Sequence, residues 1–350
     1  MPRILFAWPG LPDYAARCIR ACVDDLDADV FVVATKPNVP VKGMEDSLGQ
    51  PISWLDPNVI NVTLSSIGIP LPDILFVGGS FFPAFKCLAD EVKRSGSKVV
   101  LMSDDNWRGT LRQMIFDPIR YRASLRYRYD SIFVPGESGK LLAKRTGYSD
   151  SCIQLGLYGA DSTIFSSIVS ITERAKRFIY VGQFVKRKNV IALVDAFSSF
   201  YENHPDWELW LCGSGPLAGR LIDVPGVRCF DFVQPKELAK MIHNSRCLVL
   251  PSHEEHWGVV VHEAALSGCA LLLSTAVGSA VDLARKENSI TFKPKSKKAI
   301  EDALIEFSSW DDQQCTAAQN KSIGLAKKFG PEVFSYSVSS IIRSYCPKQC

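Results

Sequence analysis

Residues 251–274 have the sequence PSHEEHWGVVVHEAALSGCALLLS, and this stretch indicates the fold of the chain around it. It follows an apolar run, turns at a Pro-Ser pair, and becomes apolar again from Gly258 onward. This alternation predicts a buried strand, a polar loop, a buried helix and, after Gly268, a second buried strand. Glu263 lies inside the predicted helix, where a carboxylate is costly unless it is paired or faces a polar ligand. We therefore expect this helix to border a ligand site.

A second glutamate, Glu255, lies in the polar loop eight positions before Glu263. At a rise of about 1.5 Å per residue, Glu263 should lie roughly 8 Å along the helix from its start at Gly258. The first amides of a helix are free to bind a phosphate. Two carboxylates beside such a terminus can hold the hydroxyls of a ligand whose phosphate rests on those amides. Glu255 could alternatively just complement the helix dipole, for about 0.3–1 kcal/mol, but this does not explain Glu263.

The same alternation of short apolar runs with helical patterns extends along most of the chain. It predicts an α/β fold with two Rossmann-like, doubly wound domains of parallel strands that face each other across a cleft. Ligands of such sheets bind at the loops that follow the strands. Besides the strand after Gly268, the predicted strands are residues 3–8, 29–34, 74–77, 98–102, 131–134, 177–181, 207–211, 227–233, 247–250 and 290–292, with weaker candidates around 52–55 and 59–64.

The 350 residues suggest about two domains, and the Ser/Thr-containing stretch 160–176 is the best linker between them. We predict an N-terminal domain of residues 1–160 and a C-terminal domain of residues 161–330. A last amphipathic helix in residues 331–350 should pack back onto the first domain.

Composition and charge narrow the class of protein. The chain is 47% hydrophobic and 22% charged with a net charge of +3, so it can form ordinary cores, and its charge does not indicate nucleic-acid binding. Eleven cysteines without a CxxC pair suggest buried thiols in a reducing compartment and no zinc site. The chain has no apolar stretch of about 18–20 residues, and its first residues suggest a strand and no signal peptide. We expect a cytoplasmic protein, with a peripheral position at the inner membrane face as a further hypothesis.

Two loops of the second half have ligand-binding character. Lys186, Arg187 and Lys188 follow a predicted strand and its glycine, and such cations suit a diphosphate, although a solvated basic loop is the alternative. Gly213 and Gly215 follow the next predicted strand, where they form either a tight turn or a ligand contact.

Together these segments resemble the retaining glycosyltransferases of the GT-B fold, in the large family usually numbered four and also known as group 1 glycosyltransferases. The resemblance covers about residues 130–310. The residues that carry it are Pro251-Ser252-x-x-Glu255-x-Trp257-Gly258-x4-Glu263-Ala264, the loop Gly182 to Lys188, the segment Gly213-Ser214-Gly215-Pro216-Leu217, and Gly159-Ala160-Asp161 followed by Phe165.

The resemblance implies an acceptor domain at the N-terminus, a nucleotide-sugar donor domain at the C-terminus, and transfer by front-side displacement with retention, without a metal or another cofactor. It implies that Lys188 and Arg187 stabilise the departing diphosphate and that Glu255 holds the sugar. Glu263 would bind the ribose. The remaining residues implied for the donor are Trp257, Gly258, Val259, Val233, Gln183, Gly213 and Gly215. The acceptor would be a glycan, a lipid-linked molecule or a small molecule.

The chain also departs from the family pattern. Gln183 stands where the family commonly has an arginine, and all five histidines lie in the second half, whereas many members have one near the acceptor. In the first domain we expect Gly10, Asp104 and Asp105 near the acceptor, with a plain helix N-cap as the alternative for either aspartate. Two other hypotheses remain: a nucleotide-sugar epimerase or phosphorylase of the same fold, or a catalytically weakened nucleotide-sugar-binding protein.

Six arginines and several aromatic residues lie between Arg108 and Arg128, with Asp117 as the one acidic residue inside the segment. A solvated helix face is one interpretation. Contact with an anionic membrane or a lipid phosphate is another, because each basic residue near such a surface contributes about 1 kcal/mol. We do not expect nucleic acid as a partner.

Overall fold

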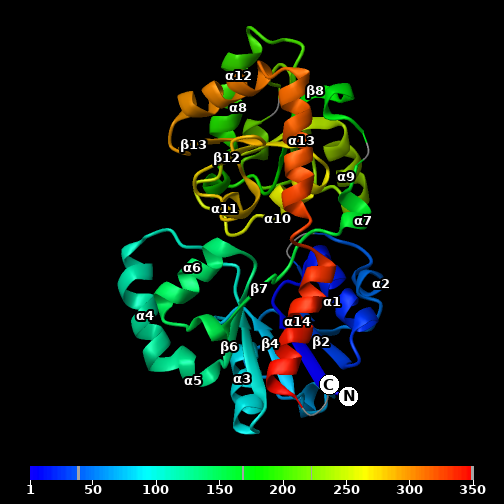
Figure 1. The fold of residues 1–350 in the computed structure, drawn as a ribbon, viewed down its shortest axis with the longest axis vertical. Coiled ribbons are helices and arrows are strands. Elements are labelled where there is room, and N and C mark those ends of the chain that lie inside the picture. Colours follow the sequence, from blue (N-terminus) through cyan, green and yellow to red (C-terminus); the bar gives the residue numbers. More distant parts are fainter. Residues whose placement is uncertain (38–39, 168, 222, 348–350) are drawn as a thin grey trace. The chain divides into compact units, whose positions relative to one another are not determined.

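The computed structural model describes residues 1–37, 40–167, 169–221 and 223–347, and within them the chain forms two compact units (Figure 1). Unit 1 comprises residues 1–159 and 329–350, and unit 2 comprises residues 160–328. The final residues of the predicted C-terminal segment, 348–350, lie outside the described part of the chain.

Unit 1 is built on a seven-stranded parallel sheet with the order β3-β2-β1-β4-β5-β6-β7. Its central strands are apolar along their whole length because helices cover both faces of a parallel sheet. The strands are β1 Arg3–Trp8, β2 Asp29–Thr35, β3 Ser53–Leu55, β4 Ile74–Gly78, β5 Lys98–Met102, β6 Ser131–Val134 and β7 Ile153–Leu155.

The helices of unit 1 include one from the far end of the chain. The Phe334 ring of α14 packs on Phe6 and Phe133, with ring centroids 5.8 and 5.4 Å apart, and Ser335 Oγ donates to Ala21 O in α1. The helix α14 therefore completes the core of unit 1. The helices are α1 Asp13–Asp25, α2 Met44–Leu48, α3 Pro83–Arg94, α4 Asp117–Arg120, α5 Arg126–Arg128, α6 Glu137–Thr146 and α14 Pro331–Tyr345.

Unit 2 contains a six-stranded parallel sheet with the order β10-β9-β8-β11-β12-β13. The strands are β8 Ala175–Val181, β9 Glu208–Cys212, β10 Val227–Phe230, β11 Ser245–Leu250, β12 Ala270–Ser274 and β13 Ser289–Phe292. The chain runs from β8 to β10 on one side and from β11 to β13 on the other. The loops after β8 and β11 therefore lie at the switch point where such sheets bind ligands.

The helices of unit 2 alternate with these strands (Figure 1). They are α7 Ser162–Phe165, α8 Val190–Tyr201, α9 Pro235–His243, α10 Val259–Leu266, α11 Ala280–Leu283, α12 Lys297–Ser308 and α13 Asp312–Ala326. The prediction of two Rossmann-like domains with parallel sheets is confirmed. The predicted strand 227–233 was too long, because β10 ends at Phe230. No helix in the described part of the chain has the length and hydropathy needed to cross a bilayer.

Candidate functional site

The loops after β8 and β11 are tied together by hydrogen bonds. The His253 amide donates to Arg187 O at 2.8 Å, and Arg187 Nη1 donates to Glu254 O at 3.4 Å. Asn189 Nδ2 donates to Pro251 O at 3.2 Å. Since β8 and β11 are neighbouring parallel strands, their carboxyl ends meet at one edge of the sheet. Two segments more than sixty residues apart in the sequence thus form one surface.

Lys188 and Glu255 form a buried ion pair at this surface. Lys188 Nζ contacts Glu255 Oε2, and the two residues are only 8% and 7% exposed. Ser252 Oγ also donates to Glu255 Oε2, at 3.2 Å. Burial lowers the pKa of Lys188, an effect that the neighbouring Glu255 carboxylate opposes. Two of the three residues that the sequence proposes as catalytic are therefore in direct contact.

A left-handed turn at Asn189, with φ of 58°, ends the short helical turn Lys186–Lys188 and positions its cations. The side-chain amide of Asn189 donates to Pro251 O and, at 2.8 Å, to Pro294 O, which fixes this conformation. Lys188 is thereby directed inward, while Lys186 and Arg187 remain exposed. Gln183 is exposed as well, and its carbonyl accepts a hydrogen bond from Tyr180 at 2.9 Å. The loop thus offers two accessible cations beside one buried cation.

The glycines of the next loop allow it to approach the loop after β8. A Cβ at Gly213 would lie 2.0 Å from Gly182 O, and a Cβ at Gly215 would lie 2.6 Å from Phe184 O. The Phe184 amide donates to Ser214 O at 2.8 Å across this contact. Close packing of two backbones accounts for both glycines, which supports the tight-turn interpretation of this motif.

Gly258 begins α10 in a left-handed conformation, with φ of 81°. The helix buries Val261 and His262, whereas Val259, Val260 and Glu263 are only half-buried. Residues three and four positions apart share one side of a helix, so these three form its accessible face. Glu263 therefore lies on the face of α10 that the core leaves open, where a polar ligand can reach it.

Two of the predicted donor residues are less favourably placed. Trp257 lies away from the accessible surface, and Val233 lies away from the switch point. Trp257 is buried, and its Nε1 donates to Asp282 Oδ2 at 3.2 Å. Its indole ring therefore belongs to the core, and a donor contact by Trp257 would involve its backbone. Val233 lies half-buried in the loop that follows β10, the edge strand of the sheet.

His262 is a structural residue that the sequence analysis missed. It is fully buried; Nδ1 accepts a hydrogen bond from the Ala160 amide at 2.9 Å, and Nε2 donates to Ala326 O at 2.8 Å. It therefore ties α10 to the first and last segments of unit 2 and must be neutral to do so. A histidine within an apolar helical run was the signal available in the sequence.

We expect unit 2 to lose stability in mild acid because of His262. Burial lowers the pKa of His262 to about 4, below its ordinary value of 6.5. As the pH falls, His262 binds a proton in the unfolded chain before it does so in the folded chain. The contribution of neutral His262 to the free energy of unfolding is therefore complete above pH 6.5 and is lost as the pH falls towards 4. The loss should reach about 3 kcal/mol. Urea unfolding between these two pH values measures it.

The matched variants for this measurement are His262→Asn and His253→Gln. His253 is exposed, so its replacement should leave the pH dependence unchanged. His262→Asn should flatten the dependence between the two pH values. An equally steep dependence in His262→Asn would show that other groups, such as the partly buried His243, cause it.

Unit 1 has a cavity of about 290 Å³ at the carboxyl ends of β1, β4 and β5. Asp104 Oδ2 accepts a hydrogen bond from Tyr158 at 2.9 Å, and the Tyr158 ring packs on Tyr14 with centroids 5.1 Å apart. The Gly10 amide donates to Thr35 Oγ1 at 2.7 Å. The lining residues are Trp8, Pro9, Gly10, Pro12, Tyr14, Gly78, Gly79, Phe81, Met102, Asp104, Leu157 and Tyr158. Gly10 and Asp104 therefore share a cavity whose described lining includes four aromatic residues and no lysine or arginine.

Asp105 lines a different and smaller cavity, of about 80 Å³, together with Arg112 and Arg120. Neither aspartate is a helix N-cap, because residues 103–110 have no regular secondary structure and the next helical turn starts after them. The N-cap alternative is therefore wrong for both residues.

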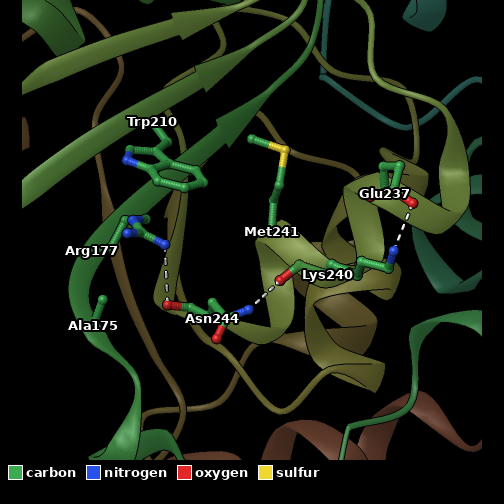
Figure 2. A pocket seen from close by; sticks show the side chains of 7 residues that line it. All are labelled: Ala175, Arg177, Trp210, Glu237, Lys240, Met241 and Asn244. Atoms are coloured by element: carbon green, nitrogen blue, oxygen red, sulfur yellow. Dashed lines mark hydrogen bonds and ion pairs between the residues drawn. The ribbon is translucent and has the colours of Figure 1, made fainter.

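A third cavity, of about 360 Å³, lies near the amino end of β8 (Figure 2). The Arg177 guanidinium stacks on the Trp210 ring, 3.4 Å from its centroid, and pairs with Glu208 at 2.8 Å. In Figure 2, Lys240 and Glu237 form a further pair along its rim. Because parallel sheets bind ligands at the carboxyl ends of their strands, the switch-point surface is the better candidate.

Known proteins are similar to this chain, both in the sequence of unit 2 and in the fold. Residues 161–322 match the model of the family described as "Glycosyl transferases group 1". The chain is 26% identical to a glycogen synthase of Mycobacterium tuberculosis over 133 residues, 36% of this chain and 32% of that protein. It is 27% identical to a D-inositol 3-phosphate glycosyltransferase of Corynebacterium kroppenstedtii over 194 residues, 48% of this chain and 43% of that protein. The chain thus spans less than half the length of these relatives.

The structure is similar to that of Anabaena HepE, a protein solved in complex with UDP and glucose. The similarity has a TM-score of 0.73 and 14% identity, and it covers 98% of this chain and 100% of HepE. At this identity the likeness shows the fold, which is the GT-B fold.

Proposed function

We propose, from the premise that residues 161–322 form a group 1 glycosyltransferase domain, that the chain transfers a sugar from a nucleotide-sugar donor to an acceptor hydroxyl. The observation that carries this proposal is the buried pair of Lys188 and Glu255 at the switch point of the unit 2 sheet, close to the start of α10. A cation, a carboxylate and free helix amides at one place match a donor that carries both a diphosphate and hydroxyls.

The donor diphosphate binds where positive charge is concentrated. Arg187 is exposed beside Lys188, and the amides at the start of α10 are the helix groups that bind phosphate. Negative charge develops on the diphosphate as its bond to the sugar breaks, and fixed cations in a partly buried site stabilise that charge strongly. Glu255, which Lys188 holds in position, accepts hydrogen bonds from the sugar hydroxyls.

The reaction proceeds on one face of the sugar, with retention of configuration. The bond from the anomeric carbon to the diphosphate oxygen breaks, and the bond from the acceptor oxygen to that carbon forms on the same face. The proton of the acceptor hydroxyl passes to an oxygen of the departing diphosphate. This course needs no enzyme nucleophile.

The acceptor sugar or headgroup binds in the unit 1 cavity that contains Gly10 and Asp104. Aromatic rings such as those of Tyr14 and Tyr158 suit the apolar faces of sugar rings, and Asp104 can accept hydrogen bonds from hydroxyls. Because the described lining has no lysine or arginine, we expect the group bound there to lack a phosphate. Asp105 lies outside this cavity and has no role in the proposal.

A nucleotide-sugar-binding protein with weakened catalysis is the second candidate. Gln183 favours it, since this exposed side chain replaces a cation that the family commonly places in the same loop.

A binding and transfer assay tests the proposal. We expect one of UDP, GDP and ADP to bind the full chain with a Kd between about 1 μM and 1 mM, the usual range of substrate affinities. UDP is the first choice, because HepE binds it. The matching labelled nucleotide sugar should then release nucleoside diphosphate in the presence of a neutral glycan or glycolipid acceptor.

The free nucleoside serves as the control, since it lacks the diphosphate and should bind much more weakly. Binding without transfer to any acceptor would favour the second candidate, and an epimerised donor would indicate an epimerase. No binding of any nucleoside diphosphate would contradict the proposal.

A further inference from the structure

Residues 111–128 form one continuous helical run, which we term the arginine-rich helix, on the outside of unit 1 (Figure 1). It includes α4 and α5 and two π-helical stretches, Arg112–Phe116 and Tyr121–Leu125. An α-helical turn contains slightly fewer than four residues and a π-helical turn slightly more. Where the two alternate, the average is about four, so side chains four positions apart align along this run. The helix therefore has rows of side chains with a period of about four.

The inner row packs on the rest of unit 1. Gln113 Nε2 donates to Asn106 O at 2.7 Å, and the Tyr121 ring packs on Tyr148 with centroids 4.5 Å apart. Leu125 and the following Tyr129 belong to the hydrophobic core. This row holds the arginine-rich helix firmly on the unit.

The row on the opposite side, which we term the outer row, is apolar and exposed to solvent. Its members are Leu111, Ile115, Ile119, Ala123 and Tyr127. The four large side chains of the outer row are between 50% and 72% exposed, and Met114 and Phe116 beside it are similarly exposed. An apolar patch of this size on one helix indicates an interaction surface.

Arginines flank the outer row on both sides. Arg112, Arg120, Arg122 and Arg126 are all exposed. Arg112 lies 3.7 Å from Asp117, the one acidic residue in the run. Within the described residues, no carboxylate forms an ion pair with Arg120, Arg122 or Arg126. The patch therefore combines apolar side chains with cations that are available to external anions.

We propose that the outer row and its flanking arginines dock unit 1 on the surface of an anionic lipid bilayer. The apolar row enters the interface while the arginines contact lipid phosphates, which is how interfacial amphipathic helices bind. A tyrosine at the end of the row suits the boundary between headgroups and chains. A second copy of the chain fits less well, because a symmetric pairing of this helix would oppose arginines to arginines.

The docking surface adjoins the aromatic cavity of unit 1. Arg120 Nη2 donates to Ser80 Oγ at 3.4 Å, and Ser80 lies between Gly79 and Phe81, which line that cavity. Phe81 is itself 73% exposed. If the proposed function holds, the acceptor reaches this cavity from the bilayer, so it is the headgroup of a lipid-linked molecule.

Sedimentation of the full chain with vesicles tests the docking surface without relying on enzyme activity. We expect binding to phosphatidylcholine vesicles that contain about 30% phosphatidylglycerol, and little binding to pure phosphatidylcholine. Arg120→Gln, Arg122→Gln and Arg126→Gln together should weaken binding about a hundredfold, at about fivefold per arginine. Ile115→Asp with Ile119→Asp should abolish binding even at low salt.

The controls are Ile60→Asp and Arg94→Gln, which change exposed residues of unit 1 outside this helix and should leave vesicle binding unchanged. Thermal unfolding of each variant confirms that the fold is retained, as expected for exposed positions. Absence of binding by the unmodified chain, or equal binding by the helix variants, would overturn the proposal. The proposal would also be overturned if the chain did not bind vesicles and instead formed a dimer, detected by light scattering, that Ile115→Asp dissociates.

Discussion

Lys188→Met is expected to lower kcat of the sugar transfer by two to three orders of magnitude. Lys188 is the buried cation of the proposed donor site, and it contacts Glu255. Loss of one positioned group that stabilises transition-state charge typically costs a factor of about 10²–10³ in kcat. Steady-state release of the nucleoside diphosphate, measured at saturating donor, gives this value.

The same substitution should also destabilise unit 2, and the two effects can be separated. Removing one partner of a buried ion pair leaves the other charge uncompensated, which costs about 3–5 kcal/mol. In Lys188→Met with Glu255→Gln the remaining side chain is neutral and can still accept the hydrogen bond from Ser252. We expect this double variant to recover most of the stability and none of the activity.

Lys176→Met is the matched control, because Lys176 pairs with Asp206 at the exposed surface, where ion pairs contribute little. It should leave both stability and turnover nearly unchanged. If the double variant regained turnover along with stability, both Lys188 and Glu255 would be structural residues only.

The strands of both sheets could be predicted because their burial leaves a direct pattern in the sequence. Runs such as 74–77 and 247–250 are apolar throughout, as strands covered on both faces must be. The short strand β7 was missed, since Ile153–Leu155 is brief and contains a glutamine. The helix α13 was missed because few of its residues are apolar, although the capping box of Asp311 and Gln314 marks its start.

The composition of the candidate site could be predicted, but its contacts could not. From the sequence, only the resemblance to the glycosyltransferase family places Lys188 and Glu255 in one site. Their direct contact depends on the pairing of β8 with β11. Asp104 and Asp105 look equivalent in the sequence, yet they lie in a loop without regular secondary structure, where no period relates the directions of neighbouring side chains. They line separate cavities.

The sequence pattern also could not predict which individual residues of a helix are buried. His262 and Glu263 are neighbours in an apolar run, and only the packing of α10 decides which one the core encloses. The core encloses the histidine, which has two backbone partners. The glutamate remains on the accessible face, where a ligand can reach it.

Glu263→Ala should therefore weaken donor binding about 10- to 100-fold without unfolding unit 2. The proposed role of Glu263 is to accept hydrogen bonds from the ribose hydroxyls, and a hydrogen bond to a charged group contributes about 1.5–3 kcal/mol. Stability should be retained, because Glu263 lies on the accessible face of α10 and alanine is the best helix former. Calorimetric titration with the nucleoside diphosphate that the unmodified chain binds measures the loss.

The ribose role is isolated by repeating the titration with the 2′,3′-dideoxy form of the same nucleotide. If Glu263 binds those hydroxyls, the dideoxy nucleotide should bind the unmodified chain and Glu263→Ala with equal affinity, because each change removes the same interaction. Glu306→Ala, which removes an exposed glutamate elsewhere in unit 2, controls for the change in net charge. Equal losses with both nucleotides would mean that Glu263 acts on another part of the donor. An unchanged affinity for the intact nucleotide would remove Glu263 from the site, and the accessible face of α10 would then need another explanation.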